Sequence, residues 1–291
     1  MNQKILITGA SGGFGFLAAK SLIEAGHSVV GTMRSTQGKN EKVAQDLLAL
    51  GAQIVELDVT DEESVNAGVA KTIELLGGLD VIINNAGLGS TGIQELFSVE
   101  DMQRVYDVNV FGVQRVMRAV LPHFRAQGKG TIMHISSCLG RFTSGFYGVY
   151  GSSKYALEAL AEGYRAELAG FGIESCIVEP GGMPTAFMDS LLRPSDAERA
   201  TEYGEMANAP EAALEGFHQA LMANPKQRPE QVATAIVDLL AKPYGEKPFR
   251  TVVDYMGMGE AVGHLNNVSK DITRQIYTAF GNEASLSLNE A

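Results

Sequence analysis

Tyr150 and Lys154 stand four residues apart in the run VYGSSKYALEALAEGYRAEL. Apolar residues recur in this run at helical spacing, so we expect both side chains on one face of a single helix. A phenol titrates near pH 10, and one cation at about 4 Å stabilises its anion by roughly 4 kcal/mol at an effective dielectric constant near 20. We therefore expect the pKa of Tyr150 to fall by about 3 units. Such a phenol is a general acid and base, although this spacing is also common on ordinary amphipathic helices.

A glycine-rich loop lies between the first predicted strand and the first predicted helix, with the sequence Thr8-Gly9-Ala10-Ser11-Gly12-Gly13-Phe14-Gly15. Glycines at this point let the backbone approach a pyrophosphate, whose charge is met by free N–H groups and by the dipole at the helix N-terminus. Asp58, at the end of the third predicted strand, supplies the context that a dinucleotide site requires. The sequence therefore predicts dinucleotide binding at this loop.

The same loop also matches G-x-S-x-G, the nucleophile elbow of α/β-hydrolases, with Ser11 as the nucleophile. That elbow normally follows a central strand with other strands before it, whereas one predicted strand precedes Ser11. An Asp and a His should also follow at strand ends, and of the five histidines only His264 has a late loop position. The hydrolase stays as a remote alternative.

The composition favours a small-molecule partner. The net charge of -11 and the pI near 5.0 argue against binding to nucleic acid or to an anionic membrane, which both reward basic patches. Cys138 and Cys176 are the only cysteines, so we expect no disulfide framework and a reducing compartment. Because no run of 18 apolar residues occurs and the first residues enter a predicted strand directly, we expect a cytoplasmic protein.

Strands and helices alternate along most of the chain. This alternation predicts an α/β protein with a Rossmann doubly wound parallel sheet and helices on both faces, with ligands outside the carboxyl ends of the strands. Residues 181–229 lack strand patterns, and we expect one or two helices there as a lid over the substrate site. We expect a single domain over residues 1–281 and a loosely ordered tail over 282–291. The predicted strands are 4–8, 28–33, 53–57, 79–84, 130–135, 172–178 and 250–255, and the predicted helices include 14–25, 41–50, 62–76, 99–125, 230–241 and 269–280.

Five motifs with chemical meaning occur in order along the chain. Together they make residues 1–255 resemble the short-chain dehydrogenase/reductases, most closely the hydroxysteroid and retinol dehydrogenase branch. The motifs are T-G-x-x-x-G-x-G at 8–15, N-N-A-G at 84–87, a serine thirteen residues before Tyr150, Y-x-x-x-K at 150–154 and P-G-x-x-x-T at 180–185.

The resemblance implies a catalytic tetrad of Asn109, Ser137, Tyr150 and Lys154. Ser137 would orient the substrate oxygen, Tyr150 would transfer the proton, Lys154 would lower the pKa of the phenol and bind the nicotinamide ribose, and Asn109 would anchor a water that links Lys154 to solvent. Ser136 is adjacent to Ser137, and the end of a strand directs neighbouring side chains oppositely. The spacing favours Ser137, while a loop hydrogen bond is the ordinary role for Ser136.

The resemblance also implies a nicotinamide cofactor. NAD-using relatives usually carry an acidic residue at the end of the second strand, where this chain has Met33, Arg34 and Ser35. A neutral residue followed by a guanidinium favours binding of a 2′-phosphate, so we expect NADP(H) as the preferred cofactor, with NAD(H) possible. The alternative is that Arg34 is a solvated loop cation, and the glycine loop lacks the second basic residue that many NADP-using relatives have. We expect no metal site. The expected cofactor-binding residues are Thr8, Gly9, Ser11, Gly13, Phe14, Gly15, Arg34, Ser35, Asp58, Val59, Asn85, Ala86, Gly87, Tyr150, Lys154, Pro180, Gly181 and Thr185.

Apolar residues near the tetrad point to a hydrophobic ketone, aldehyde or secondary alcohol, steroid-like or retinoid-like. Polar residues in the lid, Arg193 and Glu202 among them, argue against a steroid in particular. The predicted reaction is hydride transfer between nicotinamide and a carbonyl or alcohol carbon. The alternative is a regulatory protein that senses NAD(P) without turnover, which would not need the tetrad. Because relatives are usually dimers or tetramers, we expect a homodimer or homotetramer. The apolar candidates are Leu88, Cys138, Leu139, Phe142, Phe146, Tyr147, Met183, Phe187, Met188 and Leu192.

Overall fold

The computed structural model describes residues 2–288. Its strands are β1 (Lys4–Ile7), β2 (Ser28–Met33), β3 (Gln53–Glu56), β4 (Val81–Asn84), β5 (Gly130–Ile135), β6 (Ile173–Pro180) and β7 (Arg250–Val253). They form one parallel sheet in the order β3-β2-β1-β4-β5-β6-β7. The strand order reverses between β1 and β4, and a ligand crevice is expected at the carboxyl ends of the strands there. The predicted doubly wound α/β fold is confirmed.

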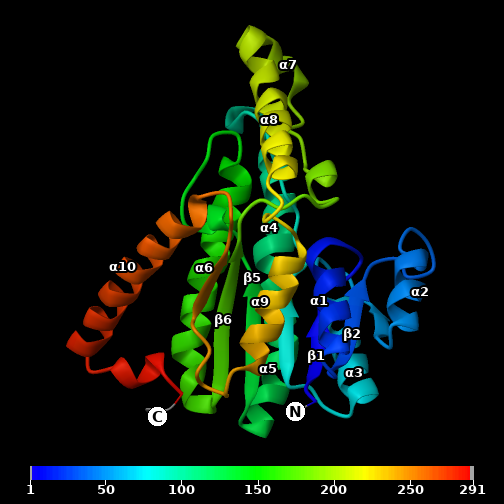
Figure 1. Cartoon of the computed structure of the whole chain (residues 1–291), viewed down its shortest axis with the longest axis vertical. Coiled ribbons are helices and arrows are strands. Elements are labelled where there is room, and N and C mark those ends of the chain that lie inside the picture. The colour runs from blue at the N-terminus through cyan, green and yellow to red at the C-terminus, as the bar shows by residue number, and fades with distance from the viewer. Residues whose placement is uncertain (1, 289–291) are drawn as a thin grey trace.

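Helices cover both faces of the sheet (Figure 1). On one face, apolar side chains of α1 (Gly13–Glu24), α2 (Glu41–Ala49) and α9 (Glu230–Ala241) share a core with the strands. The other face is covered by α3 (Glu62–Leu76), α5 (Gly112–Gln127) and α6 (Gly148–Leu168). All eight residues of β6 are buried, as expected for a parallel strand between two helical layers.

The long helix expected over residues 99–125 is found over residues 99–127, but it contains a π-helical turn that was not predicted. The segment forms α4 (Val99–Tyr106), the π-helix η2 (Asp107–Phe111) and then α5. Such turns are rare and often mark functional sites, because the extra residue changes the direction of nearby side chains. This turn contains Asn109, and apolar periodicity alone does not reveal it.

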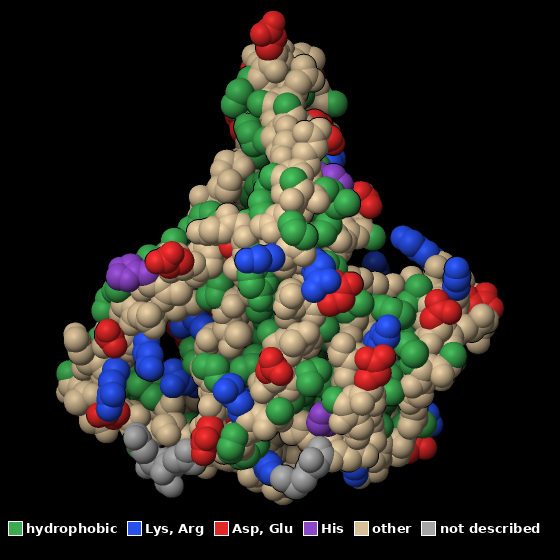
Figure 2. Space-filling view, in the orientation of Figure 1, with side chains coloured by type: hydrophobic (Ala, Val, Ile, Leu, Met, Phe, Trp, Pro, Cys, Tyr) green, Lys and Arg blue, Asp and Glu red, His purple; other side chains and the backbone are tan. Residues whose placement is uncertain are grey.

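Residues 181–229 form an arm that rises beyond the carboxyl ends of the strands (Figure 1), with hydrophobic side chains scattered along it (Figure 2). The base of the arm is fixed to α4, because the backbone N–H and the hydroxyl of Ser195 donate to the Asp101 carboxylate at 2.9 and 2.7 Å. The helical turns of the arm are η5 (Met188–Ser190), α7 (Ala197–Ala200), η6 (Thr201–Asn208) and α8 (Ala209–Ala223).

The last long helix, α10 (Met258–Ala279), begins well before the expected residue 269. Asp254 explains the early start, since its carboxylate accepts the N–H groups of Met258 and Gly259 at 2.9 Å. Part of the stretch expected to be loosely ordered forms η7 (Glu283–Leu286), while residues 289–291 lie outside the described residues. Across residues 2–288, none of the helices has the length and apolarity to cross a membrane. The remaining short helices are η1 (Gln94–Leu96), η3 (Cys138–Gly140) and η4 (Ala169–Phe171).

Candidate active site

Ser137 and Tyr150 meet at the carboxyl edge of the sheet. Ser137 follows β5, and Tyr150 lies in the first turn of α6. Burial raises the pKa of Tyr150, and the neighbouring Ser137 hydroxyl, which favours the phenolate, opposes this with a smaller effect. Ser136 points the other way, where its buried hydroxyl lies near Glu158 and favours the carboxylate form of that residue, although it makes no hydrogen bond to any described residue. The strand end therefore directs the two serines oppositely, with Ser137 beside the phenol.

Lys154 lies one helical turn after Tyr150, as the spacing predicts, but its ammonium does not bind the phenol. The Nζ atom donates to the backbone carbonyl of Ile135 at 2.9 Å and lies 5.7 Å from the centre of the Tyr150 ring. Burial lowers the pKa of Lys154 to about 8. The net fall expected for the pKa of Tyr150 is therefore not found in this structure: the pKa is raised, because desolvation of the phenol is the largest effect and the ammonium donates to Ile135.

Asn109 occupies the centre of the π-helix and is fully buried. Its Oδ1 accepts the N–H of Leu88 at 2.8 Å, while its Nδ2 donates to the Leu88 carbonyl and to the Ser153 hydroxyl, both at 2.9 Å. These contacts join η2, the loop after β4 and α6. Ser153 precedes Lys154, so the amide fixes the helix turn that presents the lysine.

The glycine loop is built against the loop that follows β4. The Thr8 hydroxyl accepts the N–H groups of Asn85 and Ala86 at 3.0 and 3.1 Å, and the Asn85 amide donates to the carbonyls of Thr8 and Gly9. A Cβ on Gly15 would lie 2.4 Å from the Gly9 oxygen, so no side chain fits there. Gly9 itself has a φ of 69°, in the left-handed region.

The open side of the same loop fits a phosphate group. Within residues 2–288, a Cβ on Gly12 or Gly13 would meet no atom within 4 Å, and no side chain caps the N-terminus of α1. The free N–H groups and the helix dipole therefore face a space where an anion would be stabilised. A cavity of about 350 Å³ brings Ser11 and Gly13 together with Thr185, three residues expected at the cofactor. The residues present fit the pyrophosphate and nicotinamide of a dinucleotide.

The expected adenosine end contains Arg34, Ser35 and Asp58. The Arg34 guanidinium is 71% exposed and lies 3.8 Å from the Asp58 carboxylate. Ser35 has a φ of 50°, unusual for a residue other than glycine, and the turn that it forms leads to Thr36, which donates twice to Glu56. An exposed guanidinium with only a loose partner remains available for a phosphate.

Several other residues that were expected to bind the cofactor make contacts within the protein itself. The Phe14 side chain packs on the core of the first face, so only its backbone is available to a phosphate. Val59 contacts Gly112, at the first residue of α5, and would meet a Cβ there at 3.0 Å. After Pro180, the Gly181 N–H donates to the Val253 carbonyl at 2.9 Å. The Gly87 backbone lies beside Asn109 and Lys154, whose Oδ1 and Nζ atoms would be 3.5 and 3.8 Å from a Cβ at Gly87.

Of the apolar candidates, Phe187 contacts the chemistry most directly. Its ring centre lies 5.9 Å from that of Tyr150. The loop after β4 leaves room for it, since a Cβ on Gly89 would lie 2.5 Å from the Phe187 ring and 2.4 Å from Leu191. The arm therefore brings apolar groups to the phenol.

The sequence analysis did not predict a group of ionic side chains, most of them buried, that lies beside the tetrad. Arg250 of β7 binds Glu158 and Glu162 of α6 and lies near Glu179 of β6. One signal was present in the sequence, because Glu158 follows Lys154 by four residues and therefore shares its helix face. Arg250 is distant in the sequence, and only the order of β6 and β7 brings it there.

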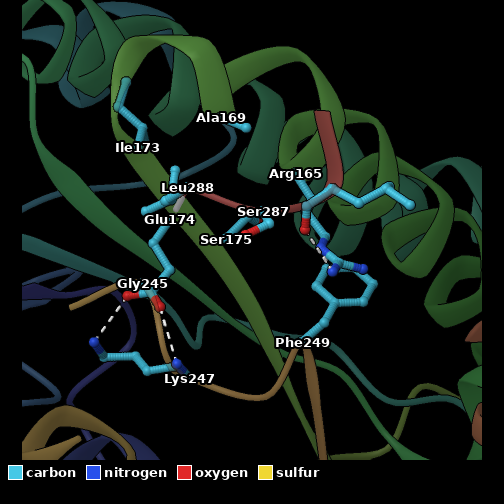
Figure 3. A pocket seen from close by; sticks show the side chains of 11 residues that line it. Arg165, Ala169, Ile173, Glu174, Ser175, Gly245, Lys247, Phe249, Ser287 and Leu288 are labelled. Carbon is cyan, nitrogen blue, oxygen red and sulfur yellow. Dashed lines mark hydrogen bonds and ion pairs between the residues drawn. The ribbon is translucent and has the colours of Figure 1, made fainter. Parts of the chain in front are cut away.

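A second pocket lies at the opposite edge, near the amino ends of β6 and β7 (Figure 3). Its volume is about 160 Å³. The polar groups of its wall have protein partners: Lys247 binds Glu174 at 2.8 Å, and Arg165 donates to the Leu286 carbonyl at 2.7 Å. The chemistry expected of the tetrad is absent from this pocket's lining residues, so we place the candidate active site at the carboxyl edge.

Comparison with known proteins shows the family of the chain. The family model described as short chain dehydrogenase matches residues 3–195. A 3-ketodihydrosphingosine reductase of Bacteroides thetaiotaomicron is 34% identical over 256 residues, which cover 86% of this chain and 87% of that protein. Human retinol dehydrogenase 8 is 34% identical over 255 residues, covering 82% and 78%. Among solved structures, a short chain dehydrogenase/reductase of Burkholderia phymatum in complex with NAD has a TM-score of 0.74 at 25% identity, covering 94% of this chain and 95% of that one.

Proposed function

The chain belongs to the short-chain dehydrogenases, which are NAD(P)-dependent oxidoreductases acting on small molecules, and we build the proposed function on this membership. We propose that the protein is an NADP(H)-dependent reductase of a hydrophobic ketone or aldehyde. The reverse reaction would oxidise the corresponding alcohol. The observation that carries the proposal is the meeting of Ser137 and Tyr150 beside the buried Lys154 and Asn109. A binding protein without turnover has no need of this arrangement.

The proton chemistry follows from the side chains. The cofactor, when bound, supplies the hydride that reaches the carbonyl carbon. Tyr150 donates its phenolic proton to the carbonyl oxygen, so that the carbonyl becomes an alcohol and the phenol becomes a phenolate. Ser137 donates a hydrogen bond to the same oxygen and orients it. The Lys154 ammonium stabilises the phenolate, and Asn109 holds the adjacent turn of α6 in place.

The choice of NADP(H) rests on Arg34. Its guanidinium is largely exposed at the end of β2 and is held only loosely by Asp58. A planar guanidinium binds a phosphate with two hydrogen bonds, and such a phosphate distinguishes NADP from NAD. We propose that the Arg34 head contacts this 2′-phosphate and that Asp58 helps to orient the side chain.

The substrate class rests on the apolar contacts of the phenol. Phe187 and Leu191 come from the base of the arm and approach Tyr150 and the loop after β4. The two relatives named above are a reductase of a lipid ketone and a dehydrogenase of retinol, both hydrophobic molecules. We propose that the arm of residues 181–229 borders the substrate site of one catalytic domain and contacts the hydrophobic part of the substrate.

The test is a cofactor titration followed by a substrate panel. Purified protein is titrated with NADPH and with NADH, and turnover is then followed by the absorbance of the reduced nicotinamide with ketones and aldehydes of increasing chain length. We expect oxidation of NADPH with long-chain carbonyls. Tight cofactor binding with no turnover on any carbonyl or alcohol would instead support the sensing protein. Hydrolysis of an ester panel that Ser11→Ala abolishes would revive the hydrolase, which family membership otherwise leaves without support.

A further inference from the structure

Buried charged side chains lie next to the Tyr150–Lys154 pair, and we call Glu158, Glu162, Glu179, Arg141 and Arg250 the charge cluster. Arg250 is at its centre. Its Nε atom lies 2.9 Å from a Glu158 oxygen, and its terminal nitrogen lies 2.5 Å from Glu162. Glu158 is buried, whereas the side chain of Glu162 is 42% exposed. Arg250 therefore joins a buried carboxylate to one that reaches solvent.

Glu179 belongs to the same cluster but is held more weakly. One of its oxygens lies 3.4 Å from Arg250 and 4.0 Å from Arg141. The other accepts the side-chain amide of Asn266, on α10, at 2.5 Å. Glu179 is fully buried, and among the described residues no group donates a hydrogen bond to the oxygen that faces Arg250 and Arg141.

The carboxyl groups of the charge cluster differ in their affinity for a proton. Glu179 is the group that takes the proton, because burial and the neighbouring Glu158 raise its pKa to about 8. Burial also raises the pKa of Glu158, but the Arg250 guanidinium, 2.9 Å from its carboxylate, favours the charged form.

Glu158 is also coupled to the catalytic pair through the fold. It follows Lys154 by one helical turn on α6, and both side chains are buried. A Cβ on Gly140, in the loop after Ser137, would meet the Glu158 side chain at 3.1 Å and the Lys154 carbonyl at 3.3 Å. The ionisable groups that surround Lys154 are Tyr150 and Glu158 of α6, the buried His134 of β5 and, behind Glu158, Arg250 of β7, Glu179 of β6 and Arg141 after η3.

We propose that Glu158 is a positioning residue for catalysis: Arg250 holds it as a carboxylate one turn from Lys154, and its charge keeps the buried Lys154 ammonium protonated where the ammonium must stabilise the Tyr150 phenolate. The proposal deepens the proposed function and rests on it. It differs from a structural role, because loss of the charge alone changes the proton affinity of Lys154. Burial of Lys154 without this carboxylate would favour the neutral amine.

The direct test is the titration of Lys154 itself, followed by NMR of the ¹³Cε resonance in the full-length protein and assigned with Lys154→Arg. In Glu158→Gln we expect the midpoint of the Lys154 titration to fall by about 1–2 pH units, the usual size of the effect when one nearby opposite charge is lost. Glu162→Gln is the matched control, since it removes a carboxylate from the same Arg250 but at the exposed end. There we expect a shift below about 0.3 units.

Kinetics supply the second readout. In the oxidative direction kcat of Glu158→Gln should begin to fall at a lower pH than that of the wild type, because without the nearby carboxylate the Lys154 ammonium, which must stabilise the phenolate, loses its proton at lower pH. Glu158→Asp keeps the charge, so its Lys154 midpoint should stay near that of the wild type. If Glu158→Gln fails to fold, Glu158→Asp and Glu158→Ala are compared instead. An unchanged Lys154 titration in Glu158→Asp together with a shifted one in Glu158→Ala supports the proposal.

Equal shifts in Glu158→Gln and Glu162→Gln, or an unchanged Lys154 midpoint in folded Glu158→Gln, would overturn the proposal. The NMR readout does not depend on turnover. If the wild-type protein oxidised or reduced nothing, the proposed function would fail, while the Lys154 titration would still decide whether Glu158 sets its proton affinity.

Discussion

Asn109 and Leu88 exchange two hydrogen bonds, one from the Leu88 N–H to Oδ1 at 2.8 Å and one from Nδ2 to the Leu88 carbonyl at 2.9 Å. The side-chain amide of Asn109 thus pairs with the Leu88 backbone through one donated and one accepted hydrogen bond, as a neighbouring strand would. It attaches the loop after β4 to the π-helical turn, and the remaining Nδ2 hydrogen bond attaches both to Ser153 on α6. The site is therefore held by an amide that contacts three elements.

Replacing Asn109 with Ala should damage both stability and turnover. The half-buried N–H and carbonyl of Leu88 would lose their partners, at a cost of up to about 1–3 kcal/mol each. We expect the free energy of unfolding in urea to fall by at least that amount, and kcat to fall because the turn of α6 before Lys154 is released. An Asn109→Ala protein as stable as the wild type would contradict the role given to this amide.

Tyr150→Phe should lower kcat by about 10²–10⁴-fold, the usual contribution of a general acid. Cofactor affinity, measured by fluorescence titration, should stay unchanged because the ring and its contact with Phe187 remain. Tyr155→Phe on the same helix is the control, since that side chain is 41% exposed. Equal turnover in the two variants would exclude Tyr150 as the proton donor.

Arg34→Ala should weaken NADP(H) binding by tenfold or more, which corresponds to about 1.4 kcal/mol, and leave NAD(H) binding nearly unchanged. The reason is the loss of the one guanidinium at the end of β2. Lys39→Ala, in the same exposed loop, controls for the general loss of positive charge. Similar losses for both cofactors in Arg34→Ala would reverse the assignment.

Gly15→Ala should lower both stability and cofactor affinity. The new Cβ would lie 2.4 Å from the Gly9 oxygen and 2.5 Å from the Asn85 amide, so the glycine loop must move at a cost of about 1–3 kcal/mol. Gly163→Ala is the control, because its Cβ would meet no atom within 4 Å and alanine favours a helix. Calorimetry with and without cofactor measures both effects. A Gly15→Ala protein that melts and binds like the wild type would show that the loop tolerates a side chain.

Stability should fall as the pH rises from about 4.5 to about 8, through Glu179. Its pKa is about 8 in the folded chain, against 4.5 as its ordinary value, so the folded state binds more protons than the unfolded state in this window. The decrease amounts to a few kcal/mol, since each pKa unit is worth about 1.4 kcal/mol. Urea denaturation at pH 5, 6.5 and 8 measures it.

Glu179→Gln removes the titrating group, so the same denaturation series should be flatter than that of the wild type. Glu162→Gln, whose carboxylate reaches solvent, should keep the wild-type slope. If Glu179→Gln keeps the wild-type slope as well, another group is responsible for the pH dependence.

The sequence by itself determined the fold and the residues of the candidate site. Alternating strands and helices specified a parallel sheet because each element must bury an apolar face, and the bounds of β2, α3, β5 and α9 follow directly from their apolar patterns. The glycine loop before α1 and the Tyr150–Lys154 spacing are local features, so they are readable without tertiary contacts.

Only the tertiary structure decided the burial, the hydrogen bonds and the pKa values of those residues. Desolvation of Tyr150, the bond from Lys154 to Ile135 and the meeting of Arg250 with Glu158 depend on chain segments far apart in the sequence. The π-turn at Asn109 is likewise invisible to periodicity, because apolar spacing reports which face is buried and not the number of residues in each turn. Electrostatic energies depend on burial and distance, and both are set by packing.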